Sequence, residues 1–299
     1  MTESNKEINL NAGQTGIYLE CVQAPDTLKY NIPVLVRLQE NVERERLIAA
    51  VRTAAEGHEA LFAVIRESRG VPSIVFKRTE IRVDTLRADR IGEGVRRFIR
   101  PFDLANGPLY RFAYLSTPEG DGLLLDVHHI VFDGMSLRLL LNEIAAAYGG
   151  EALPKESPTF SELLTPAAGD PERTERIRAM LRDELEGADF DFRLDPDQVL
   201  KEKPSGMGIV EIPVSGLPIG AGEAFAKANG ISENALFLGA FGFALAVYAG
   251  TEEAVFASAH HGRSAFRNDP VVGMFVMLQL APASWLYSHC ERLAFVLMV

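Results

Sequence analysis

Two adjacent histidines followed by an Asp-Gly pair are the residues of this chain best suited to acid–base chemistry. His128, His129, Asp133 and Gly134 lie in the run VHHIVFDG, residues 127–134. An imidazole has an unperturbed pKa of about 6.5, and burial among apolar neighbours lowers that pKa. A neutral imidazole at pH 7 accepts a proton from a hydroxyl or ammonium nucleophile. The motif therefore predicts acyl transfer.

The alternation of side chains along a strand separates the two imidazoles. If a strand continues to residue 129, His129 ends its apolar face, and His128 shares the other face with Asp126, an available carboxylate partner. We therefore expect His129 to be the catalytic base and His128 to support it. Asp133 either fixes the local backbone or orients an imidazole. Gly134 allows close approach of backbone or substrate, and the positive end of a following helix favours developing negative charge there.

The segments around the motif predict a strand that leads into a helix. Residues 123–129 have the composition of a strand. Apolar residues then recur at helical spacing at Leu137, Leu140, Leu141, Ile144 and Tyr148. Gly149-Gly150 ends this helix. The histidine pair therefore lies where a strand is followed by a helix.

Strands and helices alternate along the rest of the chain, which predicts an α/β or α+β class. Further strands are predicted at 32–38, 73–77, 109–115, 209–214, 254–259 and 274–280. Further helices are predicted from an N-cap at Asn41 to Gly57, and at 91–100, 171–187 and 232–248. The helix at 232–248 is apolar nearly all round, so we expect it to be buried. Residues 150–171 indicate a crossover between two lobes.

Composition excludes several classes of protein. The 299 residues carry a formal net charge of −11 without a basic stripe, which argues against nucleic acid as a partner. The two cysteines, Cys21 and Cys290, indicate neither a disulfide framework nor a metal site. The polar start lacks a signal peptide, and no apolar stretch reaches bilayer length, so we expect a cytoplasmic protein without membrane contact. His260-His261 lacks a following Asp-Gly, which favours a loop or strand-end pair.

The motif also resembles a known family. VHHIVFDGMS, residues 127–136, resembles the signature of condensation domains of nonribosomal peptide synthetases, which share the chloramphenicol acetyltransferase-like fold. NAGQTGIYLE at 11–20 is similar to the opening motif of that family, and HEAL at 58–61 to its second. PFDLANGPLYR at 101–111 and VGMFV at 272–276 resemble later segments, so the resemblance runs in order along most of the chain.

This resemblance implies a two-lobed fold in which each lobe has a mixed sheet with flanking helices. Residues 1–165 would form the lobe with the HHxxxDG motif, and 166–299 a partial second lobe. The implied reaction is amide formation between groups held as thioesters on donor and acceptor peptidyl carrier proteins, beside adenylation domains of the same synthetase. His129 would position or deprotonate the amine, supported by His128, with Asp133 structural and Gly134 near the reacting carbonyl. No cofactor binds directly, because phosphopantetheine of the carriers delivers the substrates, and we expect a monomer.

The chain departs from the family pattern at several positions. Gly57 and Phe62 stand where the family has arginines, one of which can pair with the motif aspartate, so Arg111 becomes the candidate partner of Asp133. Met277-Leu278 replaces the usual Asn-Thr. Family domains are longer, and the apolar end at 293–299 is either a final strand or a chain that stops in mid-element; the family length favours truncation of the second lobe.

Other functions remain open beside condensation. A non-catalytic module that docks carrier proteins fits the altered motif flanks, and an O-acyltransferase of the same superfamily shares the histidine motif. Epimerisation is disfavoured, because AHHGRS at 259–264 lacks both glutamates of the corresponding epimerase segment. Heterocyclisation is disfavoured because such domains replace the histidine pair with aspartate-based residues.

Overall fold

The computed structural model describes residues 7–165, 171–186, 219–251, 253–263 and 271–284. The chain divides into two compact units. The first unit comprises Met1–Ala168 with Ala259–Met277, and the second comprises Gly169–Ser258 with Leu278–Val299. The segment 259–277 therefore belongs with the amino-terminal part of the chain. The expected lobe boundary between residues 165 and 166 stays a prediction.

Helices and strands alternate in the first unit and the described part of the second. The strands are β1 (Ile8–Asn9), β2 (Asn31–Arg37), β3 (Ala63–Ser68), β4 (Val71–Phe76), β5 (Val83–Arg87), β6 (Tyr110–Ser116), β7 (Gly122–His128), β8 (Glu253–His260) and β9 (Met277–Ser284). The helices are α1 (Ala12–Gln23), α2 (Arg44–Glu56), η1 (Glu59–Phe62), α3 (Ile91–Phe98), η2 (His129–Val131), α4 (Gly134–Gly149), α5 (Phe160–Leu164), α6 (Pro171–Leu185), α7 (Ile219–Ala228) and α8 (Glu233–Ala249). This mixture confirms the predicted class.

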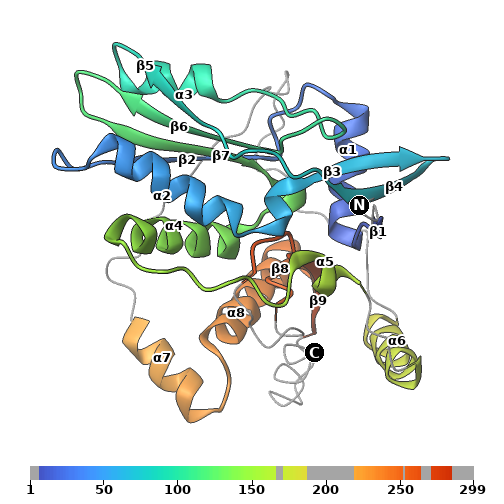
Figure 1. Ribbon diagram of the computed structural model, residues 1–299. Coiled ribbons are helices and arrows are strands. Elements are labelled where there is room, and N and C mark those ends of the chain that lie inside the picture. The colour runs from blue at the N-terminus through green and yellow to red at the C-terminus, as the bar shows by residue number, and fades with distance from the viewer. Residues whose placement is uncertain (1–6, 166–170, 187–218, 252, 264–270, 285–299) are drawn as a thin grey trace, which may run out of the picture. The chain divides into compact units, whose positions relative to one another are not determined.

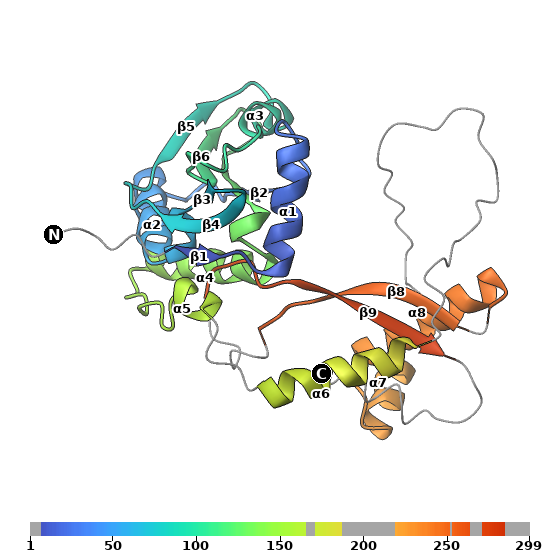
Figure 2. The same ribbon diagram turned by 90° about the vertical axis from the view of Figure 1, so that its right-hand side faces the viewer.

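A four-stranded sheet, in the order β2-β7-β6-β5, forms the centre of the first unit (Figure 1). β7 pairs antiparallel with both neighbours, and β5 runs parallel to β6. In Figures 1 and 2, α2 and α4 lie side by side along one face of this sheet. A smaller antiparallel sheet, β1-β4-β3, completes the unit. β7 is therefore an interior strand, and the histidine motif lies at its end.

The alternation along β7 places apolar side chains on both faces. Leu123, Leu125 and Val127 belong to the large core that contains residues of α2 and α4. Leu124 faces the opposite way, into a smaller cluster with Phe98 of α3. Since burying a leucine or valine side chain contributes roughly 1.5–3 kcal/mol, this double burial makes β7 a rigid support for the histidine motif at its end.

β7 ends one residue earlier than the sequence predicts. Its last residue is His128, which lies opposite Asn31 of β2. The His129 N–H instead donates to the Tyr30 carbonyl at 2.8 Å, and η2 begins. The alternation argument therefore does not extend to His129, because its backbone has already left the sheet. α4 then ends at Gly149. Gly150 caps it in the left-handed conformation, with a φ of 85°, as expected from the Gly-Gly pair.

Two expectations for helices are wrong. α2 is capped by Glu43 rather than Asn41, and no side-chain hydrogen bond caps it. α8 is not buried all round, because Phe237 is 64% exposed and Val247 is 63% exposed. The predicted strand at 209–214 and the apolar end at 293–299 lie outside the described residues.

The described part of the second unit contains α6, α7, α8 and most of the β8–β9 pair. Ser232 caps α8 by accepting a hydrogen bond from the Ala235 N–H at 3.1 Å. Within the described residues, no single helix has the length and apolarity to cross a membrane, and α7 with α8 reaches that threshold only as a pair bent by 109°.

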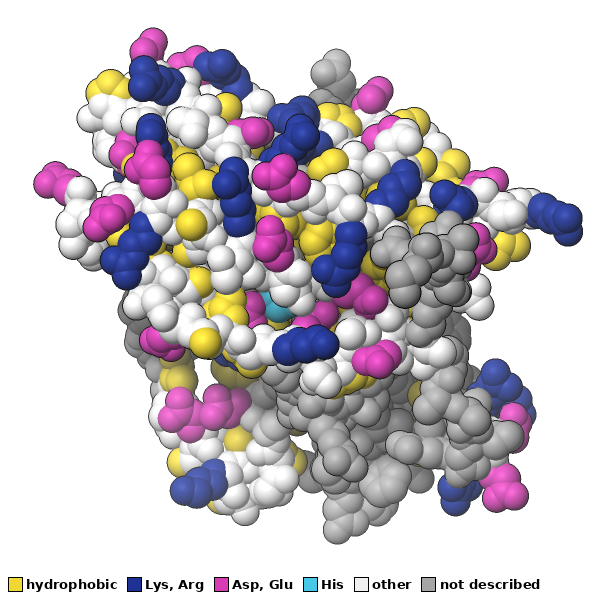
Figure 3. Space-filling model, viewed as in Figure 1, with side chains coloured by type: hydrophobic (Ala, Val, Ile, Leu, Met, Phe, Trp, Pro, Cys, Tyr) yellow, Lys and Arg dark blue, Asp and Glu magenta, His cyan; other side chains and the backbone are white. Residues whose placement is uncertain are grey.

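Acidic and basic side chains are interspersed over the visible face of the first unit (Figure 3). The surface ion pairs of the first unit include Arg97–Glu93 and Arg90–Glu119. This face therefore has no single-sign stripe of the kind that binds a nucleic-acid backbone.

Candidate active site

The turn that carries His129 is tied to two neighbouring segments. The His129 N–H donates to the Tyr30 carbonyl, and the Ile130 carbonyl accepts from Gln14 Nε2 at 2.8 Å. Gln14 is fully buried and belongs to the capping box at the start of α1, where it bonds reciprocally with Asn11. α1 was not predicted from the sequence, although the spacing of Asn11 and Gln14 is a capping signal.

His128 is held as a neutral imidazole. Its Nδ1 accepts from the Ile130 N–H at 3.2 Å, so the ring proton of the neutral form lies on Nε2, which faces Cys21 Sγ at 3.7 Å. Phe102 packs edge-on against the ring. Burial, with smaller contributions from His129 and Arg111, lowers the pKa of His128 to about 4. His128 therefore orients the turn and is a poor base.

Asp126 is not the partner of His128. It accepts hydrogen bonds from Arg111 Nη1 and Asn31 Nδ2, both at 2.8 Å. Burial raises the pKa of Asp126 and lowers that of Arg111, so each charge is disfavoured alone and their pairing offsets this effect. The expectation that Asp126 assists an imidazole is wrong, because its hydrogen bonds come from Arg111 and Asn31.

Asp133 is fully buried, and both of its oxygens are engaged. As the N-cap of α4 it accepts from the Ser136 N–H and hydroxyl, each at 2.8 Å. Arg263 Nη2 donates to its two oxygens at 2.9 and 3.0 Å. The expected partner Arg111 is therefore wrong, and Arg263 takes that role. With its oxygens occupied, Asp133 fixes the backbone, whereas the orientation of an imidazole is left to other groups.

Arg263 lies two residues after the second histidine pair, and no local sequence pattern there indicates a bond to Asp133. It lies 130 residues from Asp133, is 5% exposed, and also donates to the Gly273 carbonyl at 3.3 Å. Gly262 has a φ of +67°, and a Cβ there would meet the Phe275 carbonyl oxygen at 1.9 Å. Because glycine has no Cβ, the backbone at Gly262 can lie close to the Phe275 carbonyl. This approach is a tertiary contact, so a local sequence pattern does not reveal it. His260 ends β8, as expected for a strand-end pair.

The imidazole of His129 is not engaged by hydrogen bonds with the described residues. Its side chain is half-buried, and Nδ1 is buried without a hydrogen-bond partner among the described residues. Gly134 begins α4 a few residues later, and a Cβ built on it would have open space within 4 Å. The structure therefore combines an imidazole without hydrogen bonds to the described residues with room beside the start of a helix.

His58, which also lies in the first unit, has a hydrogen-bond partner at each ring nitrogen. His58 Nδ1 lies 3.0 Å from Glu156, and Nε2 lies 2.5 Å from Glu143. Burial alone would lower the pKa of His58, but the hydrogen bonds and charges of the two carboxylates outweigh it and raise the pKa to about 9. From the sequence, His58 was identified only as part of a motif, and Glu143 and Glu156 were not predicted as its partners.

A cavity of about 520 Å³ adjoins the motif, with His128, Cys21 and Phe102 in its lining. Burial raises the pKa of the Cys21 thiol, and His128 Nε2–H already faces its sulfur. This pair is therefore unsuited to forming a thiolate nucleophile. Among the described residues, no three His, Cys, Asp or Glu side chains are grouped to hold a metal ion.

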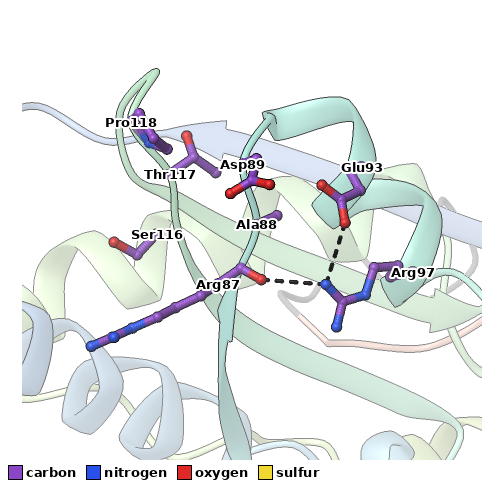
Figure 4. A pocket seen from close by; sticks show the side chains of 8 residues that line it. All are labelled: Arg87, Ala88, Asp89, Glu93, Arg97, Ser116, Thr117 and Pro118. Carbon is purple, nitrogen blue, oxygen red and sulfur yellow. Dashed lines mark hydrogen bonds and ion pairs between the residues drawn. The ribbon is translucent and has the colours of Figure 1, made fainter.

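A separate hollow of about 470 Å³ lies at the corner between β5 and α3 (Figure 4). Arg97 lines it and bonds to the Arg87 carbonyl at 3.4 Å and to Glu93 at 3.5 Å. The lining lacks an imidazole, a thiol or any residue of the histidine motif. This hollow is a poor candidate for catalysis.

The sequence of this chain is similar to that of large peptide synthetases. A family model described as the condensation domain matches residues 4–166. Bacitracin synthase 3 of Bacillus licheniformis is 28% identical over 286 residues, which are 92% of this chain and 4% of that protein. Tyrocidine synthase 3 of Brevibacillus parabrevis is 35% identical over 136 residues, 42% of this chain and 2% of that protein. The chain thus spans a small part of these relatives.

Solved structures match the fold over almost the whole chain. The epimerization domain from the third module of tyrocidine synthetase B has a TM-score of 0.74 at 21% identity, covering 97% of this chain and 69% of that one. The condensation domain of the monacolin K polyketide synthase has a TM-score of 0.69 at 18% identity, covering 97% and 71%. At these identities the likeness concerns the fold alone.

Proposed function

The chain belongs to the condensation domain family, and from that premise we propose that it joins an amine to an acyl thioester with His129 as its base. Condensation domains are acyl-transferring components of nonribosomal peptide synthetases. The proposal is that donor and acceptor groups arrive as thioesters on the phosphopantetheine arms of two carrier proteins and leave as one amide.

The imidazole of His129, which makes no hydrogen bond to a described residue, is the observation that carries this proposal. The two ring nitrogens of His128 are taken by Ile130 and Cys21. His129 Nδ1 is buried without a partner among the described residues, so the base proposed to meet the substrate is Nε2. A general base must have a free lone pair within reach of the proton it removes, and of the two adjacent imidazoles only that of His129 is left unbonded by the described residues.

In the proposed reaction, the acceptor's α-amine attacks the thioester carbonyl of the donor. The new carbon–nitrogen bond forms as the carbon–sulfur bond breaks, and His129 transfers the proton lost by the nitrogen to the departing sulfur. Gly134 leaves room for the reacting carbonyl at the start of α4, where the helix dipole favours its developing negative charge. Asp133 and His128 position the turn without taking the proton.

Product formation tests this proposal. The protein is mixed with one carrier loaded with a donor aminoacyl thioester and a second loaded with an acceptor, across a panel of amino acids. Intact mass then detects a dipeptidyl carrier. We expect His129→Gln to reduce the rate by about 100-fold or more, the usual contribution of a general base. Arg90→Gln, at an exposed ion-pair residue that is not part of the motif, is the control and should retain the rate.

Each other outcome identifies an alternative. Carrier binding without product from any pair would indicate a docking module and overturn the proposed chemistry. Acylation of a free alcohol, with no dipeptidyl carrier, would indicate an O-acyltransferase. An unchanged rate in His129→Gln would refute the assignment of the base.

A further inference from the structure

The backbone of Val271–Phe275, here called the anchored segment, is held by side chains from distant parts of the first unit. Its contacts are Val272 N–H to Glu156 at 3.2 Å, Gly273 N–H to Ser136 Oγ at 2.9 Å, Phe275 N–H to Asp133 at 3.3 Å, Asn11 Nδ2 to the Met274 carbonyl at 3.0 Å and Arg263 Nη1 to the Val271 carbonyl at 2.5 Å. Side chains therefore set the position of this segment.

Two of these contacts involve the N-terminus of α4. Ser136 and Asp133 bond to Gly273 and Phe275, and the same aspartate follows the His129 turn directly. Gly273 is also close-packed, since a Cβ there would meet Phe160 at 2.4 Å. A shift of the anchored segment would therefore disturb the hydrogen bonds of Asp133 at the base of the proposed active site.

Glu156 holds the other end of the anchored segment and is itself held by His58. The Glu156 carboxylate accepts from His58, from the Glu59 N–H at 3.1 Å and from the Val272 N–H. His58 bonds through its second nitrogen to Glu143, which lies on α4. One imidazole thus connects α4 to the residue that anchors Val272.

Charge balance explains why this connection needs a cationic ring. The side chains of His58 and Glu156 are both 3% exposed, and that of Glu143 is 13% exposed. Two carboxylates this close together in a poorly solvated place repel each other unless a cation lies between them. A neutral imidazole has one N–H and would leave one carboxylate without a donor, whereas the imidazolium has two.

We propose that His58, as an imidazolium between Glu143 and Glu156, is a positioning residue that holds the anchored segment against Asp133 and Ser136, and thereby sets the position of the His129 turn. This inference rests on the proposed function for its effect on rate. Its structural part stands independently, because the hydrogen bonds of Val272, Gly273 and Phe275 are measurable without any reaction.

Amide hydrogen exchange and kinetics together test this role. In His58→Gln we expect the peptide covering 271–275 to exchange about tenfold faster, the effect of losing one buried hydrogen bond, while β6 and β7 stay protected. The turnover number should fall about 10-fold to 100-fold, as for a small misplacement of a catalytic group, with the KM for both carriers unchanged. Glu156→Gln should show a smaller change in the same direction.

The control separates positioning from general loss of stability. Leu115→Ala removes a buried side chain in the small cluster beside α3, so it lowers stability without touching the anchored segment. It should leave both the exchange of 271–275 and the turnover number unchanged. Equal effects in Leu115→Ala, or unchanged exchange in His58→Gln, would overturn the inference.

Two further outcomes keep the proposals distinct. If His58→Gln does not fold, Glu156→Gln carries the test, and unchanged exchange there overturns the inference. If the wild-type protein forms no dipeptidyl carrier but exchange rises as expected, the proposed function fails and the structural role of His58 stands.

Discussion

Adjacent histidines have different chemistry here because their backbones belong to different elements. His128 closes β7 and points into a buried aromatic environment, where Phe102 and Tyr30 surround a ring with a pKa of about 4. His129 begins η2 and keeps an unpartnered Nδ1 within the described structure. One step along the chain thus separates a structural imidazole from the imidazole that we propose as the base.

The Asp133–Arg263 pair gives a prediction about stability. Replacing Arg263 with Met should lower the free energy of unfolding by about 3–5 kcal/mol, because it leaves a fully buried carboxylate without its cation. The double variant Asp133→Asn/Arg263→Met should recover part of this loss. Urea unfolding measures both, with Arg90→Ala, an exposed ion-pair residue, as a control near zero. A single variant as stable as the wild type would contradict this prediction.

Gly134 gives a prediction in which stability and rate change in opposite directions. Gly134→Ala should raise the free energy of unfolding by about 0.4–1 kcal/mol, since the helical backbone suits alanine and the added methyl meets open space. The rate of amide formation should nevertheless fall, because that space is where the thioester carbonyl is proposed to bind. Gly149→Ala, at the other end of α4, is the matched control and should leave the rate unchanged. Equal rates in both variants would argue against substrate contact at Gly134.

At the scale of elements, the site depends on three segments meeting at the start of α4. β7 delivers the motif, α1 supports the turn through Gln14, and the anchored segment closes over Asp133. Asn11 of the α1 cap also donates to the Met274 carbonyl of the anchored segment, and buried bonds of this kind between side chain and backbone are costly to leave unmade. The turn is therefore fixed before any substrate binds.

The support from α1 can be tested directly. Gln14→Leu should lower the free energy of unfolding by about 1–3 kcal/mol, because the Ile130 carbonyl loses its buried donor. Amide exchange at residues 129–131 should rise with it. Thr15→Ala serves as control, since its hydroxyl donates to the Asn11 carbonyl away from the turn. Unchanged exchange at 129–131 in Gln14→Leu would show that α1 does not fix the turn.

Local patterns predicted the elements that have a strong period and clear ends. The strand before the motif, α4 and its Gly150 cap follow from alternation, helical spacing and a glycine pair. α1 was missed because its apolar residues lack a helical period, and the end of β7 was misplaced because the Tyr30 contact is tertiary. The exposure of α8 likewise depends on packing that composition alone does not determine.

The partners within the site were the least predictable part. Arg111 is closer to Asp133 in sequence than Arg263 is. In the sheet, however, Arg111 of β6 lies opposite Asp126 of β7 and forms an ion pair with it. Arg263 reaches Asp133 only because the segment 259–277 packs within the first unit. Pairings across such separations follow from topology, which a local pattern does not contain.

At the scale of the whole molecule, two buried histidines make stability depend on pH in opposite directions. The pKa of His128 in the folded protein is about 4, below its ordinary value of about 6.5. The contribution of His128 to the free energy of unfolding is therefore lost as the pH falls from 6.5 through 4. The folded pKa of His58 is about 9, so its contribution is complete below 6.5 and lost as the pH rises through 9. Each contribution is on the order of 3 kcal/mol.

Urea unfolding at pH 5, 6.5 and 9 should therefore give the highest stability near pH 6.5. His128→Gln should flatten the acid side of this profile, and His58→Gln the alkaline side. Leu115→Ala should lower stability about equally at all three pH values, because its side chain does not titrate. A His58→Gln profile as steep above pH 6.5 as the wild type would show that the imidazole does not lie charged between its two carboxylates.

The different roles of the two motif histidines are tested most directly by comparing His128→Gln and His129→Gln in single-turnover amide formation, alongside their thermal unfolding. We predict that His129→Gln lowers the rate by about 100-fold or more with little change in Tm. His128→Gln should lower Tm, because it disrupts a buried network, and should lower the rate less than His129→Gln does, because it shifts the turn without removing the base. The reverse pattern, with rate lost in His128→Gln and kept in His129→Gln, would contradict the assignment of His129 as the base.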